Sequence, residues 1–113
     1  MKEIKAYVRE EKLQAVIRAL RAAGARAVTA VRVVPLGSEV DAAFVDFSSA
    51  RPITQYPPMV TLELVCPDAD AATYVQVISS GALTGHRGDG AIFVSAVEEA
   101  VHIRTGTRGE AAL

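Results

Sequence analysis

The sequence predicts an α+β domain in which strands and helices follow the order βαββαβ. Two observations carry this prediction: apolar residues alternate at a period of two in residues 2–8 and 59–66, and they recur at helical spacing in two other segments. The 113 residues are enough for one hydrophobic core and too few for two. We therefore expect a single domain, residues 1–113, of the ferredoxin-like type, with one antiparallel sheet and both helices on one of its faces.

The first half of the chain supplies a strand, a helix and a second strand. In residues 2–8, the apolar Ile4, Ala6 and Val8 lie on one side and charged residues are interleaved with some slippage, which indicates a strand buried on one face. From Glu11 the apolar spacing becomes helical, and Gly24 is a natural end for that helix because glycine accepts the left-handed conformation. Residues 28–34 are rich in valine and predict the second strand.

The second half repeats this pattern. Met59–Cys66 alternates well and predicts the third strand. A helix follows, with Asp68 or Asp70 as its expected N-cap, because a carboxylate there accepts hydrogen bonds from the first free amides. Residues 92–96 predict the fourth strand, and residues 100–104 an additional short one.

Composition excludes several classes of protein. Twelve basic against thirteen acidic residues give a net charge of −1, which argues against a nucleic-acid binder. Apolar runs are far too short to cross a bilayer, so we expect no membrane insertion. The single cysteine, Cys66, cannot form an internal disulfide, which favours a reducing, cytoplasmic location. Neither a nucleophile arrangement nor a metal-ligand spacing is present, so we expect neither an enzyme nor a metal protein.

The turn from Thr84 to Gly90 is the most informative segment. It contains three glycines, which allow several backbone amides to converge on one point, as in loops that bind phosphate-type anions. By spacing alone, an ordinary glycine turn between a helix and a strand explains the segment equally well.

Two motifs make the sequence recognisable. Residues 84–94 read T-G-x-x-G-D-G-x-I-F-V and resemble the B-loop signature of the PII signal-transduction family. Residues 102–106 read H-x-R-T-G and are similar to the C-loop of that family. The resemblance covers the whole chain, including M-K-x-I at its start and a glycine after the first helix.

This resemblance implies a homotrimer that binds adenine nucleotides in three clefts between subunits. It divides the chain into a T-loop at about residues 37–58, a B-loop at 84–91 and a C-loop at 102–113. In the family, the T-loop reaches out to partner proteins, so the resemblance implies a regulatory protein whose target is a membrane transporter or an enzyme.

The family's nucleotide-binding positions carry over residue by residue. The B-loop glycines and Asp89 would hold phosphates through backbone amides, and Arg104 would reach across from the next subunit with its two-pronged guanidinium. Thr29 and Val65 would frame the adenine. The complete set implied by the resemblance is Thr29, Gly37, Val65, Gly88, Asp89, Gly90, His102 and Arg104.

The match to the family is incomplete where charge matters. Typical members have lysines at the positions of Met59 and Ala91, an arginine at His102 and a glutamine at Glu39. A triphosphate carries roughly four negative charges, and each partly buried cation beside it contributes on the order of a few kcal/mol. We therefore expect ADP or AMP, as effector ligands rather than as obligatory cofactors, to be preferred over ATP.

Two alternatives remain open. The T-loop lacks the tyrosine that typical members modify, which indicates a different partner. PII-like relatives with divergent T-loops are associated with inorganic carbon, so the first alternative is a sensor of bicarbonate or another small anion. The second is a trimeric scaffold whose site no longer binds a ligand.

Overall fold

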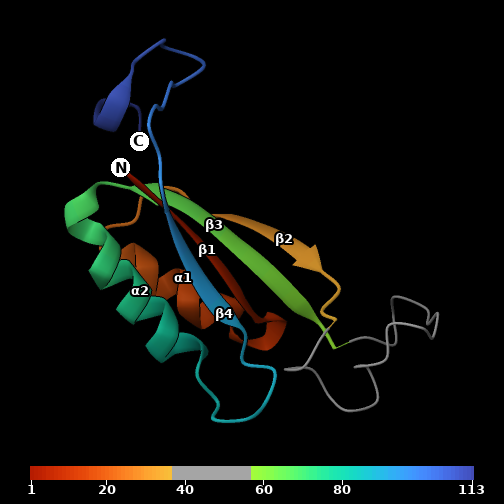
Figure 1. The fold of residues 1–113 in the computed structure, drawn as a ribbon. Helices are drawn as coiled ribbons and strands as arrows, with labels where there is room; N and C mark the ends of the chain where they lie inside the picture. Colours follow the sequence, from red (N-terminus) through yellow and green to blue (C-terminus); the bar gives the residue numbers. More distant parts are fainter. Residues whose placement is uncertain (37–56) are drawn as a thin grey trace.

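The computed structural model describes residues 1–36 and 57–113, so Gly37, Glu39 and the predicted T-loop as far as residue 56 lie outside the described residues. The elements agree with the predicted order βαββαβ (Figure 1). They are β1 (Lys2–Arg9), the 3-10 turn η1 (Glu10–Lys12), α1 (Leu13–Ala22), β2 (Thr29–Val33), β3 (Met59–Cys66), α2 (Asp68–Ala82), β4 (Ala91–Ala96) and the 3-10 turn η4 (Gly109–Ala112).

The four strands form one antiparallel sheet in the order β2-β3-β1-β4. The α+β ferredoxin-like prediction is confirmed. Tyr7 pairs with Thr61 on one side and with Ala91 on the other, so β1 is held between two partners along most of its length. β3 therefore holds β1 along its whole length, and β4 holds it as far as Tyr7.

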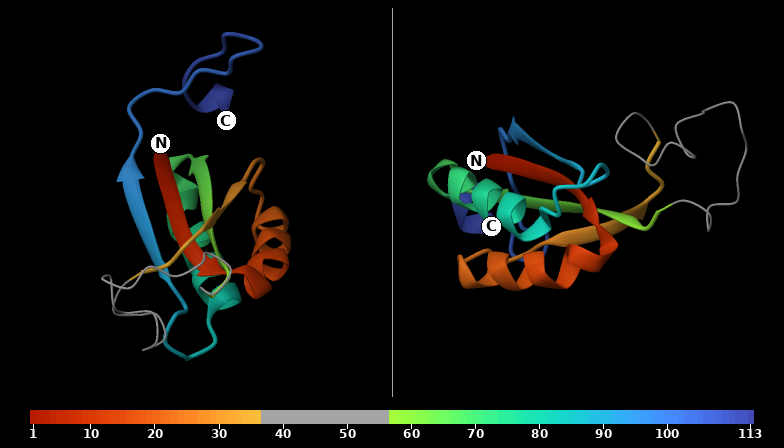
Figure 2. Two further views of the ribbon diagram at one scale, coloured as in Figure 1. Left: turned by 90° about the vertical axis from the view of Figure 1, so that its right-hand side faces the viewer. Right: turned by 90° about the horizontal axis from the view of Figure 1, so that it is seen from below.

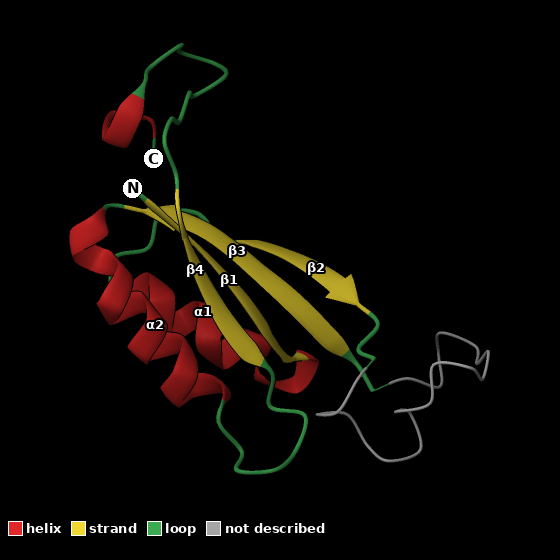
Figure 3. Ribbon diagram, in the orientation of Figure 1, coloured by secondary structure: helices red, strands yellow, loops and turns green. Residues whose placement is uncertain are grey.

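Both helices pack against the same face of the sheet (Figure 3). The side chains of β1 that face them are the predicted ones, and Ile4, Ala6 and Val8 are buried. Val16 and Leu20 from α1 are buried in the same core. Burial of this apolar surface is the main source of stability in so small a domain.

Cys66 behaves as a small apolar residue of the core. Its side chain is free of any disulfide and only 2% exposed. Burial raises the pKa of its thiol, which disfavours the reactive thiolate.

The prediction of an aspartate N-cap for α2 is wrong. The N-cap is Pro67, and no side chain caps the helix there. Asp68 instead accepts an ion-pair contact of 3.0 Å from the amino group of Met1, and this contact lowers the pKa of its carboxyl. The reason is tertiary, because pairing of Lys2 with Cys66 brings the chain terminus to the start of α2.

The predicted short strand at residues 100–104 is also wrong. The segment after β4 extends beyond the end of the sheet and turns back on itself, with one isolated bridge between Val101 and Arg108 (Figure 1). The amide of His102 donates to the carbonyl of Thr107 at 2.8 Å, and that of Gly106 donates to the carbonyl of His102 at 2.8 Å. The alternation in this segment therefore belongs to a projecting hairpin-like turn.

No helix in the described part of the chain combines the length and the hydropathy needed to span a membrane.

Candidate functional site

The loop that joins α2 to β4, residues 84–90, is organised around one carboxylate. Oδ2 of Asp89 accepts hydrogen bonds from the amides of Thr84 and Gly85, each at 2.8 Å, and Oδ1 accepts one from the Thr84 hydroxyl. The side chain of Asp89 therefore turns inward and closes the loop. An aspartate can do this because its short carboxylate mimics a backbone acceptor in a turn.

Two glycines of this loop are required by its backbone. Gly88 has φ of +96° and Gly90 of +98°, values that side-chain-bearing residues rarely adopt. A Cβ atom on Gly90 would lie 1.7 Å from the carbonyl oxygen of Tyr7. No hydrogen bond among the described residues uses the amides of Gly88 and Gly90. Those two N–H groups are thus available to an anion.

Arg9, the last residue of β1, connects the loop to the sheet. Its Nε donates to Oδ1 of Asp89 at 3.0 Å, and its Nη2 donates to the carbonyl oxygen of Arg87 at 2.6 Å. The side chains of Arg9 and Asp89 are 24% and 21% exposed, so this ion pair is screened by water less than a surface pair would be.

Asp89 is strongly acidic in the folded protein. The hydrogen bond from the Thr84 hydroxyl, then that from the Thr84 amide, and then Arg9 and the Gly85 amide hold the pKa of its carboxyl well below the ordinary value of 3.8. A carboxyl whose pKa is lowered by folding adds stability above its unfolded pKa, and this stability is lost as the pH falls toward the folded value.

Comparison of the protein with its Asp89→Asn variant tests this assignment. The free energy of unfolding of the variant is expected to be lower by a constant amount between about pH 5 and pH 7, because the carboxyl is ionised in both folded and unfolded chains there. Below about pH 4 the difference is expected to shrink, because the unfolded chain then takes up the proton first. Urea unfolding followed by circular dichroism measures it. A difference that stayed constant down to about pH 2.5 would contradict the lowered pKa.

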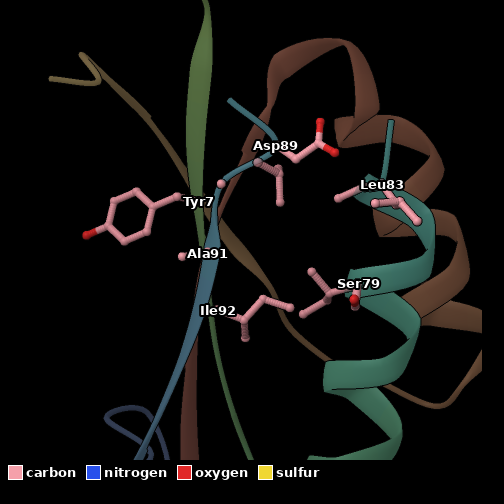
Figure 4. Close-up of a pocket in the computed structure, with 10 residues that line it drawn as sticks. Tyr7, Ser79, Leu83, Asp89, Ala91 and Ile92 are labelled. Atoms are coloured by element: carbon pink, nitrogen blue, oxygen red, sulfur yellow. The ribbon is translucent and has the colours of Figure 1, made fainter. Parts of the chain in front are cut away.

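A cavity of about 290 Å³ lies behind the loop, between α2 and the start of β4 (Figure 4). Ser79 of α2 and Leu83, which directly follows that helix, line one side, and Asp89, Ala91 and Ile92 line the opposite side. Ile92 and Asp89 point toward the helix in this view, whereas the ring of Tyr7 lies on the far side of the strands (Figure 4).

The predicted site residues fall into two groups at opposite ends of the sheet (Figure 2). Gly88, Asp89 and Gly90 precede β4, whereas His102 and Arg104 follow it. The six residues of β4, which span about 20 Å, lie between the two groups. One chain therefore does not bring its own B-loop and C-loop together.

The residues expected around the adenine lie away from the loop as well. Thr29 is exposed at the start of β2 and pairs with Glu63, two residues before the half-buried Val65 on β3. Loop 84–90 lies at the other end of the sheet, beside the pairing of Tyr7 with Ala91. Gly37, the remaining predicted residue, lies outside the described residues.

The positions of the missing family lysines differ in their surroundings. Met59 is 7% exposed and pairs with Arg9, so it packs in the sheet, whereas Ala91 is exposed beside the loop. The ring of His102 lies 3.2 Å from the Thr105 hydroxyl. The guanidinium of Arg104 makes no hydrogen bond or ion pair with the described part of its own chain. No cluster of three or more metal-ligating side chains occurs among residues 1–36 and 57–113.

Sequence reasoning missed Arg9. Its place in an alternating strand indicates only an exposed charge, and nothing in the sequence shows that residue 9 meets residues 87 and 89. The one available signal is that an arginine ends β1 and that an aspartate stands just before the strand predicted at residues 92–96.

Comparison with known proteins identifies the family. The family model described as nitrogen regulatory protein P-II matches residues 1–107. The chain is 39% identical over 113 residues to nitrogen regulatory protein P-II 2 of Methanothermobacter thermautotrophicus, covering 100% of this chain and 97% of that protein. It is 37% identical over 109 residues to nitrogen regulatory protein P-II of Rhodospirillum rubrum, covering 96% of each chain. These matches, the βαββαβ fold and the glycine loop agree, and the chain belongs to the P-II family of nitrogen regulatory proteins, which are regulatory signal transducers and not enzymes.

Proposed function

We propose that this protein is a homotrimeric P-II regulator that binds an adenine nucleotide between subunits, prefers ADP or AMP over ATP, and signals through residues 37–58 to a transporter or an enzyme. The observation that carries the proposal is the state of loop 84–90. Its carboxylate is turned inward and paired with the guanidinium of Arg9, and the amides of Gly88 and Gly90 are left without a partner in the described chain. Such a loop suits a phosphate-type anion.

The distance between the two groups of site residues supports a site shared between subunits. Arg104 and His102 lie beyond the far end of β4 from the loop, so a second copy would have to supply this pair if the two groups bind one ligand. The exposed apolar side chains support assembly: Ile103 is 98% exposed, Phe93 59% and Val31 49%. A subunit interface that covers them removes apolar surface from water.

The nucleotide preference rests on charge. Ala91 supplies no cation beside the loop, and Met59 is buried. Fewer cations reduce the attraction for a triphosphate more than for a diphosphate or monophosphate, because each interaction is proportional to the product of the charges.

Calorimetric titration with AMP, ADP and magnesium ATP at one ionic strength tests this preference. ADP or AMP is expected to bind at least about tenfold more tightly than magnesium ATP, which corresponds to about 1.4 kcal/mol. Tightest binding of magnesium ATP would contradict the preference. A thermal unfolding measurement with bicarbonate separates the two alternatives. A rise in the unfolding temperature with bicarbonate but with no nucleotide would favour the small-anion sensor, and no rise with any of these ligands would favour the scaffold.

A further inference from the structure

The end of β1 grips the candidate anion loop at two points. Arg9 donates to the carbonyl oxygen of Arg87 and to the carboxylate of Asp89, so one guanidinium holds the residues on either side of Gly88. Arginine suits this role because its planar fork presents several N–H donors in a fixed geometry. The positive φ of Gly88 lies within the segment that this fork spans.

The grip starts from a rigid part of the fold. Arg9 pairs with Met59 of β3, and the amide of the next residue, Glu10, donates to the carbonyl oxygen of Pro58 at 3.1 Å. The carboxylate of Glu10 in turn accepts two contacts of 2.8 Å from the guanidinium of Arg32 on β2. A side chain that leaves such a fixed backbone can set the position of a loop, because its own start point does not move.

Arg9 also changes the electrostatics of the loop. A loop that carries the carboxylate of Asp89 would repel a phosphate if that charge were not compensated. The guanidinium of Arg9 supplies the opposite charge 3.0 Å away, where both side chains are largely shielded from water. The loop can then offer its glycine amides to an anion without a net repulsive charge.

From this geometry we propose that Arg9 is a positioning residue for anion binding: it fixes residues 87–89 from behind and cancels the charge of Asp89, so that the amides of Gly88 and Gly90 are preset for a phosphate group. The identity of the ligand rests on the proposed function above, whereas the effect of Arg9 on the loop does not.

Arg9→Gln removes the positive charge and the guanidinium that contacts residues 87 and 89, and titration with ADP measures the resulting change in affinity. Affinity for ADP is expected to fall about tenfold or more, because the loop must then be ordered by the ligand itself. Arg9→Lys is expected to recover only part of the loss, since an ammonium supplies the charge without the two-point grip. Arg18→Gln makes the same chemical change on the exposed side of α1 and is the matched control, with an expected change below about twofold.

Positioning and direct contact can be separated by the ligand series. If Arg9 acts through the loop, the affinities for AMP and ADP are expected to fall by the same factor. The reason is that both ligands must then order the loop, and this free-energy cost does not depend on the number of phosphates. A loss that grows with the number of phosphates would mean that Arg9 touches the ligand, and it would overturn the positioning role.

The ligand-free protein gives an independent test. In Arg9→Gln, the amide signals of Gly85, Gly88 and Gly90 are expected to shift. The amides of Thr84 and Gly85, which donate to Asp89, are expected to exchange faster with solvent. In Arg18→Gln these signals are expected to stay unchanged. A double-mutant cycle with Asp89→Asn is expected to be non-additive in these signals and in stability, because the two side chains share one contact. If the wild type binds no nucleotide while the amides respond as expected, the proposed function fails and the positioning role stands. Unchanged amides would overturn the positioning role itself.

Discussion

Gly90→Ala is expected to destabilise the protein by at least about 3 kcal/mol, a large part of the total stability of a domain of this size. The added Cβ would lie 1.7 Å from the carbonyl oxygen of Tyr7 and 2.7 Å from its carbon. Both atoms belong to the backbone of β1, which cannot move aside without breaking its pairing with β4. The residue would also keep a φ of +98°, which alone costs about 1–2 kcal/mol for a residue with a side chain.

Urea unfolding followed by circular dichroism measures this loss, and amide exchange at Tyr7 and Ala91 locates it. Gly85→Ala is the matched control in the same loop. Its φ of +84° carries a similar conformational cost, but an added Cβ there meets nothing within 4 Å. The control is therefore expected to lose only about 1–2 kcal/mol. Equal losses in the two variants would mean that the close approach of Gly90 to β1 does not limit stability.

Much of the fold could be predicted because local patterns and tertiary packing agree in it. The alternation of Met59–Cys66 matches a strand whose inward side chains are buried, and Ile4, Ala6 and Val8 occupy the same core. The apolar periodicity of such a strand arises from the burial of every second side chain, so the periodicity predicts which side chains are buried. The same logic explains why the strands were located better than the ends of the helices.

Other features depend on contacts between residues far apart in the chain. The cap of α2 could not be predicted, because the amino group that binds Asp68 reaches it only through the register of β1 on β3. Ile103 alternates with Val101 as in a strand, yet it is 98% exposed and lies in a turn. A single sequence does not distinguish an apolar residue that packs in its own domain from one that does not.

The candidate site likewise combines a local motif, which could be predicted, with a contact between distant residues, which could not. The glycines and Asp89 form a local motif that the sequence displays, and the structure places them together in one loop. Arg9 joins them across 80 residues of sequence, and its role depends on how β1 ends beside β4. The sequence shows that Ala91 lacks the positive charge of the lysine found in typical family members. It does not show that Arg9 is the cation that pairs with Asp89.

Arg104→Ala is expected to lower affinity for ADP by about 10- to 100-fold, because a bidentate contact between a guanidinium and a phosphate is among the stronger polar contacts in proteins. The stability of the chain is expected to change by less than about 0.5 kcal/mol, since the side chain is exposed and makes no ion pair or hydrogen bond within the described chain. Arg21→Ala, an equal loss of charge on the exposed end of α1, is the control and is expected to leave affinity unchanged.

The proposed action of Arg104 across a subunit boundary allows a complementation experiment. Arg104→Ala chains keep an intact loop 84–90, and Arg9→Gln chains keep an intact Arg104. In trimers mixed at random from equal amounts, about a quarter of the clefts would combine the two intact halves, and these are expected to bind ADP with the affinity of the wild type. If Arg104 acted within its own chain, each chain would remain defective and mixing would restore nothing. Titration of the mixture therefore decides whether the guanidinium of one protomer completes the glycine loop of the next.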